Sequence, residues 1–325
     1  MILNIIYLIL GLTLILAGAN YLTDGASLLA KRWGMSDLMI GLTIVAFGTS
    51  APELVISIMS AIEGSSGIAI GNVVGSNLFN VCVIVGITAL VAPIKVTKSI
   101  MANDIPFVIL SAIALLAIGS TALLDSGSTA AVLSRSNGII LLLFFVVFMR
   151  YTFASAKSEK TIDSTNNEDS RNVNTALWKY PVFILGGLAV LIFGGDIFVD
   201  GATGIASALG VSDAIIGLTI VAAGTSLPEL ATAVAAALKG KTGMALGNVI
   251  GSNIYNIFLV LGCSAIVRPL PFGSIGNTDL IVLVIASILF WVFGWFFKTR
   301  TITRSEGAVL LLIYIAFITM RCCNA

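Results

Sequence analysis

The chain has 325 residues, of which 58% are hydrophobic and 10% charged, and its formal net charge is +1. Soluble domains have roughly 45–50% apolar and about 25% charged residues, so this composition excludes an ordinary soluble protein and indicates one that lies in a membrane. With no excess of basic charge and no basic cluster, the sequence gives no sign of a nucleic-acid partner.

Apolar segments long enough to cross a bilayer, about 20 residues each, recur along the whole chain. Their breaks predict ten transmembrane helices. The first segment lacks the basic region and cleavage site of a secretory signal, so we expect it to be a permanent span. The predicted spans are residues 2–30, 36–62, 68–91, 104–120, 137–154, 180–209, 212–238, 244–266, 279–297 and 306–320.

The second predicted span contains the motif GLTIVAFGTSAPEL, which has proline and glutamate inside an apolar segment. Pro52 removes a helical hydrogen bond, so we expect a break that leaves backbone oxygens free from Ala46 to Thr49. At membrane depth such backbone is tolerated only against protein or a watered cavity. Thr49, Ser50 and Glu53 fall on one helical face, and a cation would satisfy these oxygens.

The third predicted span contains GNVVGSNLFN, in which Asn72, Ser76 and Asn80 are spaced by four and form a polar stripe. Glycines in the same segment allow neighbouring helices to approach closely, and small polar residues of this kind are also common in plain helix interfaces. Glu53 is different. A carboxylate in the middle of a membrane costs about 2.5–3.5 kcal/mol and marks a functional site by default.

Both motifs occur twice, at an offset of 176 residues. GLTIVAAGTSLPEL at 217–230 matches the first motif at twelve of fourteen positions, GNVIGSNIYN at 247–256 matches the second, and Asp200 aligns with Asp24. Five spans per copy is an odd number, so the second copy enters the membrane from the opposite side. We therefore predict an all-α polytopic membrane protein of two inverted five-helix repeats, residues 1–155 and 179–325, joined by a polar cytoplasmic linker, 156–178.

The basic residues of the predicted loops are unevenly divided, with fourteen on one side of the membrane and three on the other. The positive-inside rule makes the first side cytoplasmic. Both termini are then expected to be extracytoplasmic, in a multi-pass protein of the cell (inner) membrane.

Other polar residues have plainer interpretations. Asp37 and Asp213 each follow a serine at a predicted helix start, where a carboxylate caps free N–H groups. Asp24, Asp196 and Asp200 have two open interpretations, namely a position at the membrane interface or a role in an ion pathway. We expect no thiol chemistry, and a packing role for the first two cysteines, because no metal or disulfide spacing relates Cys82, Cys263, Cys322 and Cys323.

The second copy supplies its own set of oxygen-bearing residues, namely Ala222, Thr225, Ser226 and Glu229, with the stripe Asn248, Ser252 and Asn256. Two such half-sites meeting at a pseudo-twofold axis would form one central site. Carboxylate, hydroxyl, amide and carbonyl oxygens suit hard cations such as Ca²⁺ and Na⁺. The chain has no His, which argues against a zinc or copper site. Two ionised glutamates are neutralised by one Ca²⁺, by monovalent cations or by protons, so competing ions would exchange.

The paired motifs resemble the two alpha repeats of the sodium/calcium exchanger family, within the cation/calcium exchanger superfamily. The resemblance implies ten helices, of which the first and sixth slide past the rest to alternate access, and a central site carried by Glu53 and Glu229. It implies no cofactor. The other ligands that it implies are the side chains of Thr49, Ser50, Ser76, Asn80, Thr225, Ser226, Ser252 and Asn256 and the backbone oxygens of Ala46 and Ala222.

Two features depart from parts of that family. Where Asn256 stands, some relatives, including potassium-dependent ones, have Asp, so a third carboxylate is missing and potassium coupling is in question. The short linker also lacks the large cytoplasmic calcium-sensing domains of animal exchangers, so we expect no regulation of that kind.

The favoured function is an antiporter that exchanges Ca²⁺ for Na⁺ across a lipid bilayer. A Ca²⁺/H⁺ antiporter that uses the same two glutamates is the alternative. An intramembrane enzyme with a carboxylate acid/base pair is disfavoured because nothing marks a nucleophile. A passive cation channel would conduct without a counter-ion. The sequence predicts no oligomeric state, and a monomer is compatible with it.

Overall fold

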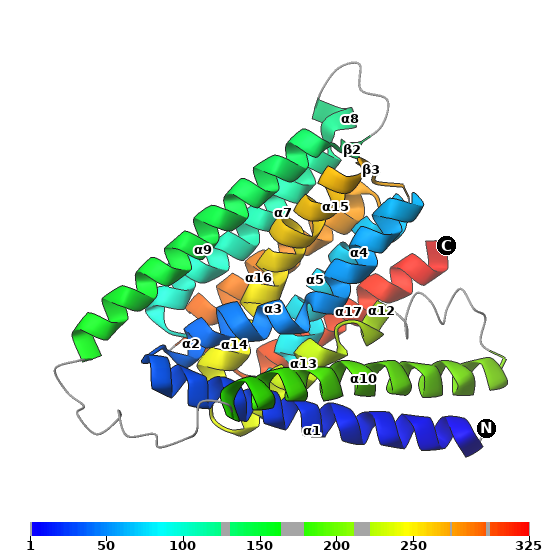
Figure 1. Ribbon diagram of the computed structural model, residues 1–325. Coiled ribbons are helices and arrows are strands. Elements are labelled where there is room, and N and C mark those ends of the chain that lie inside the picture. Colours follow the sequence, from blue (N-terminus) through cyan, green and yellow to red (C-terminus); the bar gives the residue numbers. More distant parts are fainter. Residues whose placement is uncertain are drawn as a thin grey trace.

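The computed structural model describes residues 2–124, 131–163, 179–210, 222–273, 275–296 and 300–324. The chain is nearly all-helical in these residues (Figure 1). The elements before residue 164 are α1 (Ile2–Trp33), α2 (Asp37–Ile40), η1 (Gly41–Val45), α3 (Ala46–Thr49), α4 (Ala51–Glu63), α5 (Ser66–Leu78), η2 (Phe79–Ile84), α6 (Val85–Val91), β1 (Ile94–Lys95), η3 (Ile100–Asp104), α7 (Ile105–Gly119), α8 (Thr121–Leu124), β2 (Val132–Leu133) and α9 (Arg135–Asp163). The elements after residue 178 are α10 (Lys179–Ala208), α12 (Ala222–Gly224), α13 (Leu227–Leu238), α14 (Thr242–Ile254), η6 (Tyr255–Leu261), α15 (Gly262–Val267), β3 (Leu270–Pro271), α16 (Asn277–Phe296), β4 (Thr301–Ile302) and α17 (Arg304–Asn324).

Seven helical segments among the described residues are long and apolar enough to cross a membrane, and the bent pair Asp37–Thr49 and Ala51–Glu63 makes up to eight. They coincide with eight of the ten predicted spans. The predicted span 212–238 lies partly outside the described residues, and its described part is α12 and α13. The predicted span 306–320 is helical as α17 but is not among the seven.

The long helices α1 and α10 pack against each other in antiparallel fashion at one side of the molecule (Figure 1). Glycines at intervals of seven form the contact on both helices. A Cβ on Gly18 would lie 2.6 Å from the backbone nitrogen of Leu191, and one on Gly187 would lie 2.6 Å from that of Leu22. Glycine has no side chain at these contacts, so the two helix backbones approach closely. The pair can therefore pack tightly although each residue buries little surface area.

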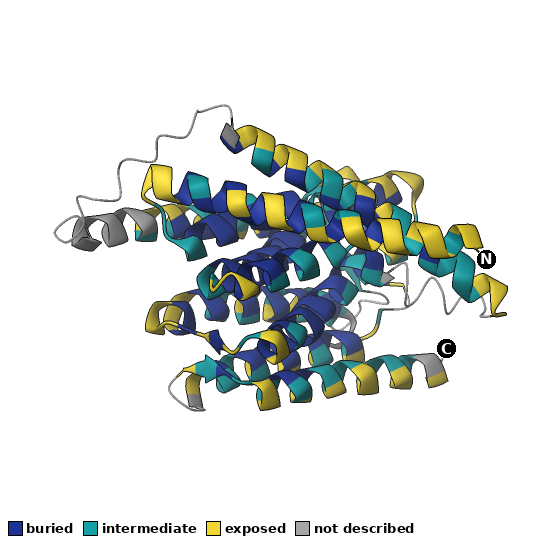
Figure 2. Cartoon of the chain, turned by 90° about the horizontal axis from the view of Figure 1, so that it is seen from below, coloured by how far each residue is buried: buried dark blue, intermediate teal, exposed yellow. Residues whose placement is uncertain are grey.

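The buried centre of the protein consists of two broken helices and two π-containing helices. Figure 2 shows the buried residues gathered in these central segments, with exposed residues along the outer helices. The continuous helices Gly67–Val91 and Thr242–Val267 are both largely buried. Each contains a π-helical segment at the same place in the duplication, η2 and η6, and such segments often occur at functional sites.

Two short antiparallel ribbons also follow the duplication. In one, Ile94 of β1 pairs with Ile302 of β4, and in the other, Leu270 of β3 pairs with Leu133 of β2. Ile94 and Leu270 are 176 residues apart. Residues near the equivalent helix ends thus form the same local structure in both copies.

Three smaller expectations can be compared with the structure. The predicted cap at the start of α2 is made by Ser36 and not by Asp37: the Ser36 side chain accepts a hydrogen bond from the Met39 nitrogen at 3.4 Å, and Asp37 lies in the first turn of the helix. Asp213 lies outside the described residues. Helix α9 continues to Asp163, which is inside the segment predicted as a linker. Cys82 is buried in the core, as expected for a packing residue.

The glycine contact gives the first prediction. Gly187→Ala should lower the melting temperature of the purified protein in detergent, because its Cβ would meet the backbone of α1 and such overpacking costs about 1–3 kcal/mol. Gly186→Ala is the matched control, since a Cβ there meets nothing within 4 Å. Equal melting temperatures for the two variants would show that α1 and α10 are not in close contact in the membrane protein.

Candidate cation-binding site

The first copy of the Pro-Glu motif, residues 41–54, forms a broken helix. The axis bends by 44° between Asp37–Thr49 and Ala51–Glu63, and the break falls at Ser50. Pro52 therefore sits in the first turn of a new helix, α4, where its missing N–H would have no helical partner anyway. The expected break is present, but the Ala46 carbonyl is not left free. It accepts the Ser50 nitrogen at 3.0 Å and Thr49 Oγ1 at 3.4 Å, because the helix keeps its bonds up to the break.

The second copy of the motif is broken at the equivalent place. Helix α13 begins at Leu227 with Pro228 in its first turn. Here the Ser226 nitrogen donates to the Ala223 carbonyl at 3.1 Å, one residue later than in the first copy, so Ala222 does not receive this bond. Residues 211–221, which lead into the motif, lie outside the described part of the chain.

The two glutamates lie in the first turns of the helices that follow the breaks, Glu53 in α4 and Glu229 in α13. Their exposed fractions are 0% and 1%. The start of a helix carries a partial positive charge, which stabilises a carboxylate there. At the first break, the preceding helical segment ends at Thr49 with carbonyl groups, which favour a cation. The first break therefore presents both a stabilised anion and the negative end of a helix dipole.

Each glutamate is held by a serine of the other repeat. Ser50 Oγ donates to Glu229 Oε1 at 3.1 Å, and Ser226 Oγ donates to Glu53 Oε1 at 3.4 Å. Thr49 lies beside the Glu229 carboxylate and Thr225 beside that of Glu53. The six predicted side chains of the two breaks are thus brought together, and the site is shared by the two repeats.

The remaining predicted ligands lie on the central π-containing helices, which pack against the broken ones. The segment η2, which holds Asn80, contacts α13, and η6, which holds Asn256, contacts α4 of the other repeat, whereas Ser76 lies beside Glu53 of its own repeat. Several buried side-chain oxygens in this region have no hydrogen-bond partner. They are Glu53 Oε2, Glu229 Oε2, Ser76 Oγ, Ser252 Oγ, Asn80 Oδ1 and Asn256 Oδ1.

Unpaired buried acceptors cost free energy unless a donor or a cation satisfies them. Six oxygens of this kind, with no imidazole or thiolate, form a donor set suited to a hard cation. Of the predicted ligands, the carbonyl of Ala46 is the one already engaged in helical hydrogen bonds.

Asn248 and Asn72, the first members of the two stripes, differ in their partners. Asn248 Oδ1 accepts Thr49 Oγ1 at 3.1 Å, and its Nδ2 donates to the Glu229 carbonyl at 3.2 Å, so it ties the two breaks together. Asn72 Nδ2 instead donates to Ser57 Oγ at 3.2 Å. Equivalent residues therefore make different contacts, and the two half-sites are not in the same local state.

A cavity of about 280 Å³ lies beside the breaks. It is bounded by Pro52 of α4, by Thr225 and Pro228 at the second break, and by Asp196 and Asp200 on α10. The cavity thus lies between the two breaks and the part of α10 that carries the two aspartates, and the rest of its lining is mainly apolar.

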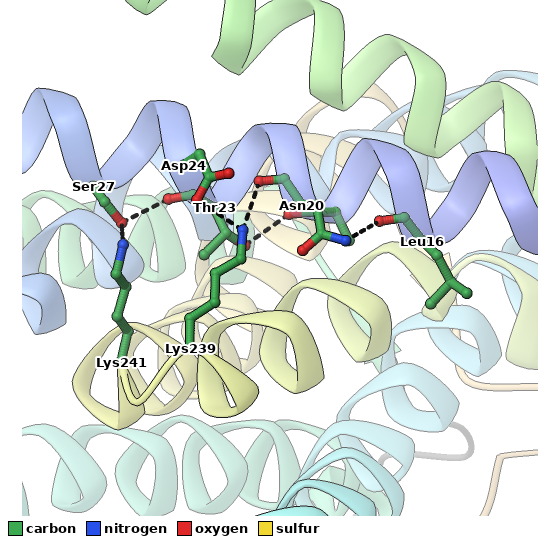
Figure 3. A network of polar contacts seen from close by, with 8 residues as sticks. Leu16, Asn20, Thr23, Asp24, Ser27, Lys239 and Lys241 are labelled. Atoms are coloured by element: carbon green, nitrogen blue, oxygen red, sulfur yellow. Dashed lines mark hydrogen bonds and ion pairs between the residues drawn. The ribbon is translucent and has the colours of Figure 1, made fainter.

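The other end of the same helix pair is tied to the core by two lysines. Figure 3 shows Lys239 and Lys241 reaching from the turn between α13 and α14 to α1. Lys239 Nζ pairs with Asp24 Oδ1 at 2.7 Å and also donates to the Asn20 carbonyl at 3.2 Å, while Lys241 Nζ donates to Ser27 Oγ. Desolvation lowers the pKa of Lys241, against the opposite effects of nearby carboxylates. Asp24 is thus an ion-pair residue, whereas its repeat equivalent, Asp200, lines the cavity.

Comparison with known proteins identifies the family of the chain. The family model for sodium/calcium exchanger protein matches residues 3–154 and 179–323. The sodium/calcium exchanger MaX1 of Methanosarcina acetivorans is 37% identical, with 98% of each chain covered. The putative antiporter CaxA of Alkalimonas amylolytica is 36% identical over 96% of each chain, and the inner membrane protein YrbG of Escherichia coli is 34% identical over 96% of this chain and 95% of its own.

Solved structures give the same result. The sodium-calcium exchanger NCX_Mj, soaked with 10 mM Na⁺ and zero Ca²⁺, superimposes with a TM-score of 0.82 at 35% identity over 98% of both chains. Of these proteins, MaX1 and NCX_Mj are named as sodium/calcium exchangers and CaxA as a putative antiporter. Since the family model covers both halves of the chain, and relatives align over nearly its full length, this multi-pass membrane protein belongs to the sodium/calcium exchanger family.

Proposed function

We propose that the protein is a secondary antiporter that exchanges Ca²⁺ for Na⁺ around one central site by alternating access. The observation that carries the proposal is the reciprocal pair of bonds, Ser50 to Glu229 and Ser226 to Glu53, which brings two buried carboxylates into one shared site. An ion bound there would contact both repeats. Its binding and release would therefore depend on how the repeats are arranged.

The proposed ligands are the carboxylates of Glu53 and Glu229 with the hydroxyl, amide and backbone oxygens around them. Ca²⁺ takes 6–8 oxygen ligands, and six unpaired side-chain oxygens already lie in this region. The other proposed ligands are Thr49, Ser50, Thr225, Ser226 and the carbonyls of Ala46 and Ala222. The Ala46 carbonyl already accepts two hydrogen bonds, so to bind a cation it would have to lose the longer one, from Thr49 Oγ1.

The proposed architecture is ten transmembrane helices in two inverted five-helix repeats. Three observations support it: the antiparallel packing of the equivalent helices α1 and α10, the equivalent ribbons, and the equivalent π-helical segments. The excess of Lys and Arg on one side of the predicted spans makes that side cytoplasmic, and both termini extracytoplasmic, in the cell membrane.

The two ends of the α1–α10 pair support access from one side at a time. The cavity with Asp196 and Asp200 leads to the breaks, while at the other end Asp24 is bound to Lys239. By the proposed topology the cavity faces the extracytoplasmic side. Movement of α1 and α10 relative to the core would break these contacts and open the cytoplasmic side.

Charge balance supports coupled exchange. An empty site with two ionised glutamates would carry a charge of −2 at membrane depth, which is costly, so it crosses between access states only when cations neutralise it. Na⁺ is the proposed coupling ion because the site is rich in neutral oxygens that suit it, and because the related MaX1 is named a sodium/calcium exchanger. Protons on the two glutamates are the alternative.

The coupling ion can be tested with purified protein in liposomes loaded with Na⁺ and diluted into sodium-free choline medium containing radioactive Ca²⁺. We expect Ca²⁺ uptake that follows the Na⁺ gradient and persists when a protonophore removes any pH gradient. Uptake driven by a pH gradient alone, with no effect of Na⁺, would establish proton coupling instead. Ca²⁺ flux that needs no counter-ion would indicate a channel.

The two glutamates can be tested by near-isosteric replacement. Glu53→Gln and Glu229→Gln should each weaken Ca²⁺ exchange by about 100-fold or more, because removing one member of a buried charged site costs several kcal/mol. Glu63→Gln is the matched control, since Glu63 is exposed at the end of the same helix as Glu53. Wild-type exchange by a folded Glu53→Gln protein would remove the basis of the proposed site.

A further inference from the structure

We infer that Asn77 is a positioning residue that fixes the amide of Asn256 with its oxygen toward the bound ion. The inference rests on the proposed function, but Asn77 is not itself a proposed ligand. It lies one residue beyond Ser76 and so outside the polar stripe of its own helix. Its side chain is buried, and both of its polar atoms are used on the helix of the other repeat.

Asn77 makes two bonds that determine which way its amide points. Its Nδ2 donates to the backbone carbonyl of Asn253 at 3.1 Å, and its Oδ1 accepts Asn256 Nδ2 at 3.0 Å. A carbonyl can only accept, so the nitrogen of Asn77 must face Asn253. The oxygen of Asn77 is then left for Asn256.

The orientation of the Asn77 amide determines the orientation of the Asn256 amide. Because Asn77 presents an oxygen, Asn256 must turn its nitrogen toward Asn77 and its own oxygen away. That oxygen, Asn256 Oδ1, is buried and has no partner in the protein. A lone asparagine amide could present either its nitrogen or its oxygen to an ion, and only the oxygen binds a cation. The bond from Asn77 selects the oxygen.

The other repeat lacks this arrangement. Asn253, the equivalent of Asn77, donates within its own helix to the Val249 carbonyl at 2.7 Å. Asn80, the equivalent of Asn256, has no partner for either amide atom. The orientation of Asn256 therefore comes from a specific contact and is not an automatic result of the motif.

A double-mutant comparison tests the inference because a carboxylate has an oxygen on both sides. Asp at position 256 needs no neighbour to choose its orientation, and it would even meet the oxygen of Asn77 unfavourably. The variants are Asn77→Leu, Asn256→Asp and the two combined, in liposomes. The readout is the half-saturating Ca²⁺ concentration for Ca²⁺/Ca²⁺ exchange, which involves no coupling ion. Asn77→Ala replaces Asn77→Leu if the larger side chain prevents folding.

We expect Asn77→Leu to raise the half-saturating Ca²⁺ concentration by about three- to tenfold, as for one ligand atom that loses its hydrogen-bonded orientation. In the Asn256→Asp background the same change should raise it less than twofold or lower it. Thr88→Val is the matched control and should stay near wild type, because it removes a buried hydroxyl without a hydrogen-bond partner farther along the same continuous helix.

The outcomes separate the two proposals. No Ca²⁺ exchange by the wild-type protein would overturn the proposed function and the inference with it. If the wild-type protein exchanges Ca²⁺ but Asn77→Leu matches it, Asn77 does not position a ligand. An equal loss in both backgrounds would show that Asn77 supports the fold in general.

Discussion

The structure depends on keeping two carboxylates buried in the middle of an apolar helix bundle. In the part of the chain that the structure describes, neither Glu53 nor Glu229 forms an ion pair with a basic side chain. Each lies at a helix start and accepts a hydrogen bond from a serine of the opposite repeat. Helix starts and hydroxyl donors lower the cost of the charges without cancelling them. The residual negative charge is what would give the proposed site an affinity for cations. Because each repeat supplies the donor for the other's carboxylate, neither repeat could form the site alone.

Much of this could be predicted from the duplication. Two glutamates at equivalent positions in apolar segments are hard to explain by packing, and the odd number of predicted spans per copy predicts that the two copies have opposite orientations in the membrane. The form of the helix break could not be predicted as well. The sequence predicted a kink that frees the Ala46 carbonyl, whereas the chain ends one helix at Ser50 and starts another. Proline is inexpensive in a first turn, so starting a new helix costs less than distorting a continuous one.

The contacts around the asparagines could not be predicted from helical spacing. The stripe of Asn72, Ser76 and Asn80 follows the α-helical interval of four, but the backbone changes to π spacing at Phe79, and Asn77 faces the other repeat. A signal was present, since Asn77 and Asn253 are also duplicated. The partner of Asp24 was beyond any local pattern, because Lys239 lies 215 residues away in the chain.

The differences between the two copies are those that the proposed inverted arrangement would produce. Two nearly identical motifs in opposite orientations cannot both be open to the same side, so an asymmetric state has different contacts at equivalent residues. Asn248 is bound to Thr49 whereas Asn72 is bound to Ser57, and Asp24 is paired whereas Asp200 lines a cavity. If the opposite access state reverses the roles of the two repeats, residues that differ between the copies cannot form equivalent contacts in both states. Glu63 is the repeat equivalent of Lys239, so the ion pair to Asp24 has no counterpart with Asp200. We therefore expect the two access states to differ in stability, by a free energy that depends on the bound cation.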